Sequence, residues 1–187
     1  MTPVLRPIPV PGLAPVLRPT PVLGATPVLC PLTGSSQDRV LVARLVGACS
    51  AETLRRRFFL PGEPFAGAVL ARYGRYLLAG PPDGLALVAM LAGQPVGLLN
   101  LVPAEATPGA ACHFELGILV ADPWQRRGIG TALLGHALDR HAWPGWTVRA
   151  TVQPDNLAVL ALLRVRRRVR LVSRTPGEYS YELTKAS

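Results

Sequence analysis

Cysteine, lysine and long apolar segments are scarce in this 187-residue sequence. The three cysteines, Cys30, Cys49 and Cys112, form no Cys-x-x-Cys pair and have no histidine at ligand spacing, which argues against a disulfide framework and against a zinc or other metal site. Glycine, proline and arginine interrupt every apolar run before it reaches the roughly 18 residues that a membrane span requires. Recurrent proline also breaks the apolar core of any signal peptide near the start. We therefore expect a cytoplasmic protein that binds no membrane and no metal.

The sequence does contain enough apolar material for a folded domain. Hydrophobic residues make up 49% of the chain and charged residues 17%, a balance typical of globular proteins. The start differs, because it repeats a Thr/Ala-Pro-Val-Leu unit whose prolines remove backbone donors and hold the chain extended. These features predict a proline-rich, disordered tail over residues 1–27 and one domain over residues 28–187. The tail is either a docking segment or a dispensable extension.

The net charge of +9 has two competing explanations. Six arginines gather between residues 164 and 174, and a basic cluster of this kind can bind nucleic acid. An excess of arginine together with alanine, glycine and proline is also what a GC-rich genome encodes. The cluster can equally continue the last helix into a strand with a solvated outer face. Nucleic-acid binding is therefore the third of three functional hypotheses, and we do not expect nucleic acid as a partner.

Apolar periodicity and turn residues divide the predicted domain into helices and strands. Ser35 and Asp38 have the spacing of a capping box before a helix over residues 36–47, and Ser50 caps a second short helix. Pro61 and Gly62 end this second helix, and the segment from there to residue 84 is rich in glycine and proline, which predicts a loop. A strand begins at Val28, and further strands are expected over residues 85–91, 96–102, 112–120, 146–152, 169–173 and 179–183, with helices over residues 130–141 and 156–164. This order predicts a mixed α/β layer structure.

A glycine pair follows the strand over residues 112–120. Gly128 and Gly130 lie between this strand and the next helix, so the backbone there can approach a ligand closely. The first N–H groups of a helix are unpaired and attract anions such as phosphate, and Arg126 and Arg127 add cationic donors. The pattern lacks the lysine of a P-loop and the third glycine of a dinucleotide fingerprint. The alternative is an ordinary tight turn without a ligand.

The sequence of this turn resembles the signature of the GNAT family of acetyl-CoA-dependent N-acetyltransferases. The signature is Gln or Arg, two residues, Gly, one residue, then Gly or Ala, and here it is Gln125-Arg126-Arg127-Gly128-Ile129-Gly130. The segment over residues 49–59 is similar to a Ser-Pro-Glu-Ser-x-x-x-Arg-Phe-Phe segment of many bacterial members. The resemblance covers about residues 28–187 and implies the GNAT fold, an α/β architecture whose mixed, mostly antiparallel central sheet is flanked by helices and splays between its fourth and fifth strands.

The resemblance also implies how acetyl-CoA, the co-substrate, would bind. The pyrophosphate would contact the backbone of Arg126, Arg127, Gly128, Ile129, Gly130 and Thr131. The pantetheine arm would lie along Ile118, Leu119 and Val120, and Asn156 would form a hydrogen bond to it. A free strand edge suits this role physically, because it offers alternating donors and acceptors to the two pantetheine amides.

Catalytic residues are where the sequence departs from the family pattern. Leu163 stands where many members have a tyrosine acid, and Thr151 stands where some have a catalytic glutamate. Arg167 and Arg168 replace a closing Gly-Phe pair. Glu115 remains as the candidate general base, because a carboxylate within an apolar strand is costly unless it is paired or faces a wet cleft. The alternative for Glu115 is a salt bridge to an arginine.

Three functions remain in view. The first is an enzyme, an acyltransferase that moves acetyl from acetyl-CoA directly to a primary amine of an unidentified small molecule or protein. The second is an acyl-CoA-binding module of the same family with little turnover, which the residues at positions 151 and 163 favour. The third is the basic nucleic-acid-binding protein. The sequence leaves open whether the protein is a monomer or a homodimer.

Overall fold

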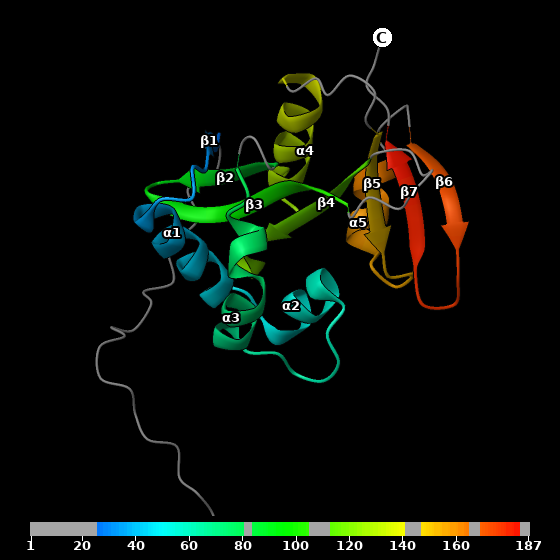
Figure 1. The fold of residues 1–187 in the computed structure, drawn as a ribbon, viewed down its shortest axis with the longest axis horizontal. Coiled ribbons are helices and arrows are strands. Elements are labelled where there is room, and N and C mark those ends of the chain that lie inside the picture. The colour runs from blue at the N-terminus through cyan, green and yellow to red at the C-terminus, as the bar shows by residue number, and fades with distance from the viewer. Residues whose placement is uncertain (1–25, 81–83, 105–112, 141–146, 165–168, 184–187) are drawn as a thin grey trace, which may run out of the picture.

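The computed structural model describes residues 26–80, 84–104, 113–140, 147–164 and 169–183. Its strands are β1 (Val28–Pro31), β2 (Leu85–Leu91), β3 (Gln94–Pro103), β4 (His113–Val120), β5 (Thr147–Val152), β6 (Val169–Arg174) and β7 (Tyr179–Leu183). Its helices are α1 (Ser36–Gly47), α2 (Ala51–Phe58), α3 (Ala66–Leu77), the 3₁₀ turn η1 (Asp122–Trp124), α4 (Ile129–Arg140) and α5 (Leu157–Arg164). Figure 1 shows these elements along the chain.

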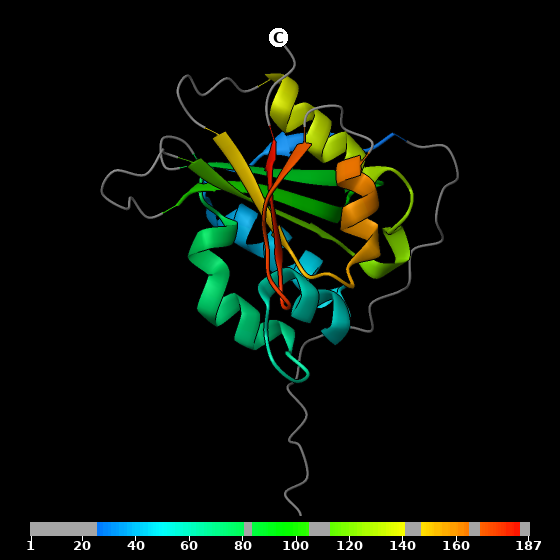
Figure 2. The same cartoon turned by 90° about the vertical axis from the view of Figure 1, so that its right-hand side faces the viewer.

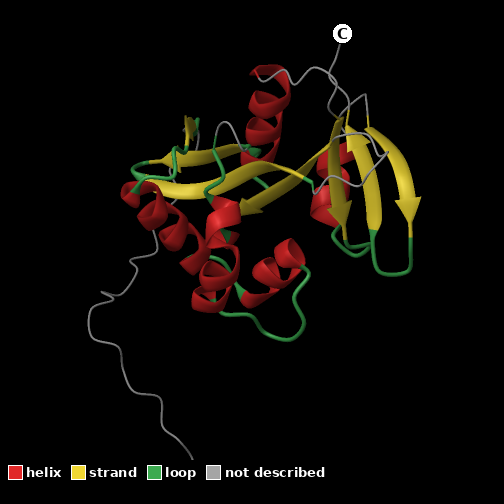
Figure 3. Cartoon of the chain, viewed as in Figure 1, coloured by secondary structure: helices red, strands yellow, loops and turns green. Residues whose placement is uncertain are grey.

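The strands form one mixed sheet in the order β1-β2-β3-β4-β5-β7-β6. Every neighbouring pair is antiparallel except β4 and β5, which are parallel. Figure 3 shows that β5, β7 and β6 turn away from the part of the sheet that contains β2 and β3. The predicted mixed, mostly antiparallel α/β architecture is confirmed.

Helices cover both faces of the sheet. Figures 1 and 2 show α1, α2 and α3 on one side of β2, β3 and β4, with α4 on the other. The core lies between these layers, where β2 and β3 are buried on both faces over most of their length. Leu45, Val46, Leu99 and Leu133 are fully buried, and they show how the core joins α1, β3 and α4. Burial on both faces explains why β2 and β3 are continuous apolar runs rather than alternating ones.

Local signals in the sequence account for the ends of several elements. Ser35 and Asp38 form the expected capping box of α1, with the Ser35 side chain accepting from the Asp38 N–H at 3.1 Å and Asp38 accepting from the Ser35 N–H at 3.0 Å. The β2–β3 turn has φ of 47° at Ala92 and 73° at Gly93, as a two-residue type I′ hairpin requires. The hairpin prediction is therefore confirmed, although β3 begins at Gln94 rather than Val96.

The prediction of a loop before β2 is wrong over α3. This helix begins at Ala66, and its N-cap residue Phe65 forms no side-chain capping hydrogen bond. Glycines at two positions within the helix also weaken the helical signal. The helix forms because Val69, Tyr73 and Leu77, at successive spacings of four, lie along one side of it and pack into the core. Tertiary packing thus outweighs the local propensity.

Some predictions concern residues outside the described ranges. They include most of the proline-rich tail, Cys112 at the predicted start of β4, the Arg167-Arg168 pair and the residues around position 141. Where the chain is described, none of its helices combines the length and the apolar character needed to cross a bilayer.

Candidate functional site

The site is centred on the point where β4 and β5 separate. The parallel pairing runs from His113 opposite Thr147 to Glu115 opposite Arg149, and it ends there. Beyond Glu115, β4 continues to Val120 while paired only with β3. The second half of β4 therefore has an edge that no described strand occupies, as the predicted splay between the fourth and fifth strands requires. A free edge offers unpaired backbone donors and acceptors to a ligand.

A cleft of about 300 Å³ opens at this separation. Residues of α2, α3, β4, β5 and α5 line it, so elements distant in the sequence contribute to one space. Of the predicted site residues, Glu115, Ile118 and Asn156 face the cleft together. Leu119 is 2% exposed and packs into the core, so it can serve a ligand only through its backbone, whereas Val120 is half-buried and packs against the core.

The turn that follows β4 has an unusual backbone. Arg126 has φ of 60° and Gly128 has φ of 79°, and α4 begins at Ile129. Positive φ is costly for a non-glycine residue, and such strain gathers at functional sites. Left-handed residues placed among ordinary ones turn successive N–H groups toward one side and create a concavity for an anion. Positive φ at Arg126 and Gly128 is compatible with such a concavity next to the N-terminus of a helix, and anion binding at this turn stays a prediction.

Buried side chains pack against the core side of this turn, and its two arginines are exposed to solvent. Trp124 is 5% exposed and belongs to the core, and the Arg127 guanidinium lies 5.3 Å from the centre of its ring. Arg126, Arg127, Gly128 and Thr131 are exposed, and Ile129 is buried. Gly97 gives Ile129 its space, since a Cβ on Gly97 would lie 2.8 Å from the Ile129 Cγ2. The turn thus presents its backbone and two arginines to solvent on a fixed base.

Glu115 lies in the cleft, at the last position of β4 that pairs with β5. Its Oε1 is 3.0 Å from the Nε2 of His113, and its side chain is 37% exposed. The structure therefore does not bear out the alternative of an arginine partner among the described residues, because the ion-pair contact of Glu115 is with His113. A solvent-accessible carboxylate that a histidine orients can accept a proton.

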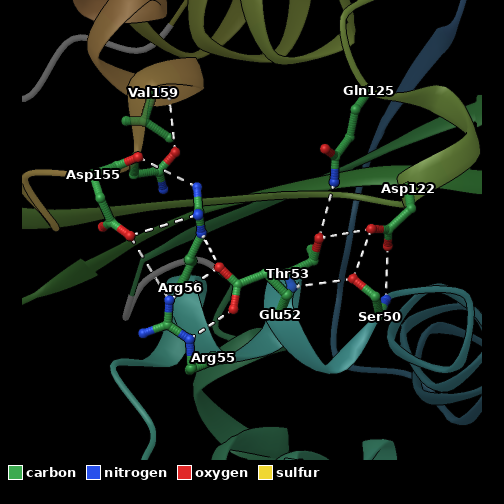
Figure 4. A network of polar contacts seen from close by, with 10 residues as sticks. Ser50, Glu52, Thr53, Arg55, Arg56, Asp122, Gln125, Asp155 and Val159 are labelled. Carbon is green, nitrogen blue, oxygen red and sulfur yellow. Dashed lines mark hydrogen bonds and ion pairs between the residues drawn. The ribbon is translucent and has the colours of Figure 1, made fainter. Parts of the chain in front are cut away.

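The first turn of α2 binds the beginning of the anion-binding turn (Figure 4). Asp122 accepts hydrogen bonds from the Ser50 N–H at 2.7 Å, from the Ser50 hydroxyl at 2.7 Å and from the Thr53 hydroxyl at 2.9 Å. The Gln125 amide donates to the Thr53 hydroxyl and to the Val120 carbonyl, each at 3.1 Å. The first glutamine of the signature therefore has a structural role, joining β4, α2 and the turn.

The opposite side of α2 binds the loop between β5 and α5, as Figure 4 also shows. Glu52 accepts from Arg55 at 2.7 Å and from Arg56, and both arginines face Asp155 at 3.9 and 3.5 Å. Hydrogen bonds from Arg55 and Arg56 lower the pKa of Glu52 to about 2, and the bond with Glu52 raises the pKa of Arg55. Helix α2 thus connects the two loops that flank the open edge of β4.

The residue before α5 and residues within β5 and α5 also face the cleft. Asn156 accepts from the Val159 N–H at 3.3 Å through Oδ1, so it caps the helix and has its amide N–H₂ left for a ligand. Thr151 and Leu163 line the cleft at the two positions where the family pattern places catalytic residues. Leu163 is 2% exposed and offers no proton.

Sequence reasoning missed four polar residues of the cleft, Arg56, Arg57, Tyr73 and Tyr76. The two tyrosines lie on α3, which the composition of its surroundings concealed, although the four-residue spacing from Val69 to Tyr73 to Leu77 was a usable signal. Arg57 belongs to the Arg-Phe-Phe segment, but nothing in the sequence shows where its side chain points. Among the described residues, no group of three or more His, Cys, Asp or Glu side chains could hold a metal ion.

Comparisons with known proteins agree with this geometry. Solved structures similar to the chain include the GNAT domain of S. lividans PAT, with 23% identity over 86% of this chain and 91% of that chain and a TM-score of 0.67. A phosphinothricin acetyltransferase from Sinorhizobium meliloti in complex with AcCoA is 15% identical over 86% of this chain and 90% of that chain, with a TM-score of 0.64. An acetyltransferase from Thermus thermophilus is 20% identical over 84% of this chain and 96% of that chain, with a TM-score of 0.59.

At these identities the solved structures show the fold, and the family follows from the sequence itself. No curated protein sequence matches the chain. The sequence profile of the acetyltransferase (GNAT) family matches residues 51–166, which include α2, the cleft strands and the anion-binding turn. Because this match spans more than half of the chain, the protein belongs to the GNAT acetyltransferase family.

Proposed function

We propose that the protein is an N-acetyltransferase that moves acetyl from acetyl-CoA directly to a primary amine. The observation that carries the proposal is the open edge of β4, which has an anion-binding turn at one end and a cleft carboxylate at the other. The family uses acetyl-CoA, and a structural neighbour was solved with it. The matched residues lie within the proposed domain over residues 28–187.

The chain's own groups fit the parts of acetyl-CoA. The N–H groups of the turn over residues 126–131 and the cations of Arg126 and Arg127 suit a pyrophosphate. The backbone of Ile118, Leu119 and Val120 suits the pantetheine amides, with one acceptor site of the Val120 carbonyl already used by Gln125. The Asn156 amide N–H₂ supplies a further donor. Bound acetyl-CoA would supply an activated acetyl group as a thioester.

Glu115 is the proposed general base. Amines are protonated at neutral pH, and a protonated amine has no electron pair with which to attack a thioester. A carboxylate in the cleft can accept that proton directly or through one water, and His113 holds the carboxylate in place. The described residues that line the cleft include no cysteine, which supports direct transfer over a covalent enzyme intermediate.

A binding module with little turnover is the second candidate. It is favoured by Leu163 and Thr151, which leave the two usual catalytic positions of the family without an acid or a carboxylate. Tight binding of acetyl-CoA without transfer to any amine would support this candidate. The nucleic-acid hypothesis has less support, because Arg170 of the basic cluster pairs with Glu182 at 3.0 Å and Arg174 lies over the Tyr179 ring.

The test combines binding with turnover. Acetyl-CoA binding is measured by calorimetry, and thiol release is followed with a panel of amino acids, polyamines, peptides and protein N-termini. Phosphinothricin is included because a structural neighbour is named for its acetylation. We expect micromolar acetyl-CoA binding and amine-dependent thiol release. Absence of acetyl-CoA binding at millimolar concentration would contradict the proposal.

A further inference from the structure

Three consecutive arginines on α2 have very different partners. Arg55 and Arg56 both pair with Glu52 and Asp155 on the solvent side of the helix. Arg56 and Arg57 both line the cleft, but no carboxylate of the described residues lies within ion-pairing distance of Arg57. Of these two cleft arginines, Arg57 is therefore the one without an anionic partner in the described chain.

The guanidinium of Arg57 lies directly against β4. A Cβ atom on Gly117 would be 1.6 Å from the Arg57 Nη2 and 2.2 Å from its Cζ, so the side chain occupies space that only glycine leaves. Gly117 is two residues from Glu115 on the same strand and therefore points to the same face. Arg57 and the proposed base thus lie on one side of β4, within one cleft.

The partners that Arg57 does have are neutral. Its Nη2 donates to the Oδ1 of Asn100 at 2.8 Å, and Asn100 is 1% exposed and donates in turn to the Tyr76 carbonyl at 3.4 Å. Its guanidinium lies 4.9 Å from the centre of the Phe58 ring and 5.6 Å from that of Tyr76. The Arg57 Nε is buried, and it forms no hydrogen bond within the described chain.

This arrangement leaves a cation ready for an anion. A guanidinium has several N–H donors in a planar fork that matches a carboxylate, and a charge withdrawn from water is costly until it is paired. Glu115 does not fill this role, because its carboxylate contacts His113. The missing partner can therefore come from a ligand in the cleft.

We propose that Arg57 binds the carboxylate of the acetyl acceptor, so that the acceptor is a small amino acid carrying both an amine and a carboxylate. The inference rests on the proposed acetyl transfer and adds the chemical class of the substrate. Ile118 and Asn156 assign part of the cleft of about 300 Å³ to the pantetheine arm, so the space that remains beside Arg57 suits a small acceptor. The carboxylate held at Arg57 leaves the amine of the same molecule free to approach Glu115 and the acetyl group.

The competing explanation is that Arg57 only joins α2 to β3 through Asn100. A tether of this kind would affect all acceptors equally, whereas a carboxylate site affects only acceptors that have the carboxylate. The experiment therefore uses matched pairs, each an amino acid and its carboxamide, for example methionine, lysine, β-alanine and γ-aminobutyrate. We expect the wild-type kcat/KM for the best acid to exceed that of its amide by about tenfold to hundredfold, as a charge-assisted hydrogen bond implies.

Two variants act on this preference in different ways. Arg57→Gln removes the cation and should lower the kcat/KM of the acid at least about tenfold more than that of its amide, mainly through KM. Asn100→Asp keeps Arg57 but places a carboxylate at the atom that Arg57 already contacts, so it should reduce the preference from inside the protein. Arg75→Gln makes the same charge change at an exposed position of α3 that does not line the cleft, and it should keep the preference. If Arg57→Gln does not fold, the acid-over-amide preference of Asn100→Asp tests the proposal in its place.

A binding experiment tests the carboxylate site independently of acetyl transfer. Calorimetry in the presence of CoA compares the N-acetyl derivative of the best acid with that of its amide. Tighter binding of the acid derivative, lost in Asn100→Asp, supports the carboxylate site even if no acetyl is transferred. Acetyl transfer with equal preference for acids and amides, equal losses for both in Arg57→Gln, or acetylation of peptides in preference to every free amino acid would overturn it.

Discussion

The two ends of β4 build their sites by different means. After Val120 the chain forms the proposed anion-binding turn from its own backbone within a few consecutive residues, with positive φ at Arg126 and Gly128. At the other end the cleft collects side chains from α2, α3, β4, β5 and α5. We call the turn the donor end, because it would hold acetyl-CoA, and the cleft the acceptor end, because it would hold the amine. The donor end depends on local conformation, and the acceptor end depends on how separate elements pack.

This difference explains why members of a family can share a turn motif while the side chains of the cleft vary. Backbone N–H groups in a turn recognise phosphate whatever side chains surround them, so one short motif can serve many enzymes. A cleft lined by five elements can change its chemistry through a single substitution on any of them. We therefore expect substitutions at the two ends to separate binding of acetyl-CoA from turnover of the acceptor.

The largest effect is expected for Glu115→Gln. Loss of a general base lowers kcat by about 10²- to 10⁴-fold, while the Kd for acetyl-CoA should stay within about twofold because the turn is untouched. Steady-state kinetics and calorimetry measure the two quantities. Glu178→Gln, an exposed glutamate in the loop between β6 and β7, is the matched control. A fall in kcat below about threefold would remove Glu115 from catalysis.

The second prediction concerns the donor end. Gly128→Val places a β-branched residue at φ of 79°, which costs about 1–2 kcal/mol in the left-handed region and should weaken acetyl-CoA binding by about 5- to 30-fold. The kcat at saturating acetyl-CoA should change far less. Gly177→Val is the control, since the φ of Gly177 is not positive and a Cβ there would meet open space. Equal losses in both variants would show that the conformation of the turn has no special role.

A third prediction targets the link between the two ends. Asp122→Ala removes three accepted hydrogen bonds between η1 and the start of α2. We expect unfolding free energy to fall by about 1–3 kcal/mol in urea denaturation, and KM to rise for both substrates, because α2 supports the turn and carries Arg57. Asp139→Ala, at an exposed position of α4, controls for the lost charge. An unchanged KM for either substrate would show that the two ends are independent.

The smallest effect concerns the outer contacts of α2 and depends on pH. Hydrogen bonds from Arg55 and Arg56 hold the pKa of Glu52 at about 2, below the ordinary 4.5. A carboxyl with a lowered folded-state pKa contributes stability that is present above about pH 4.5 and is lost as the pH falls toward 2. The stability difference between the wild type and Glu52→Gln should therefore vanish over this range. The control is Glu63→Gln, at an exposed position before α3. A difference between the wild type and Glu52→Gln that stays constant from pH 7 to pH 2 would contradict the role of Glu52.

Much of the fold was predictable, because its signals are local. The capping box at Ser35, the hairpin at Ala92-Gly93 and the strand-turn-helix around Gly128 each depend on neighbouring residues. Helix α3 was not predicted, because it lacks a side-chain cap and is stabilised by packing of Val69 and Leu77 against the rest of the core. The boundary of the proline-rich tail stays a prediction, since residues 1–25 lie outside the described chain.

The sequence was sufficient to assign the family and to propose both the anion-binding turn and Glu115 as the candidate base. Each of these depends on residues that are neighbours in the chain or alternate along one strand. Only the tertiary structure placed Arg57 against Gly117 and Asn100, which lie on three different elements. Which groups share a cleft depends on how helices pack across a sheet, and that packing joins positions far apart in the sequence.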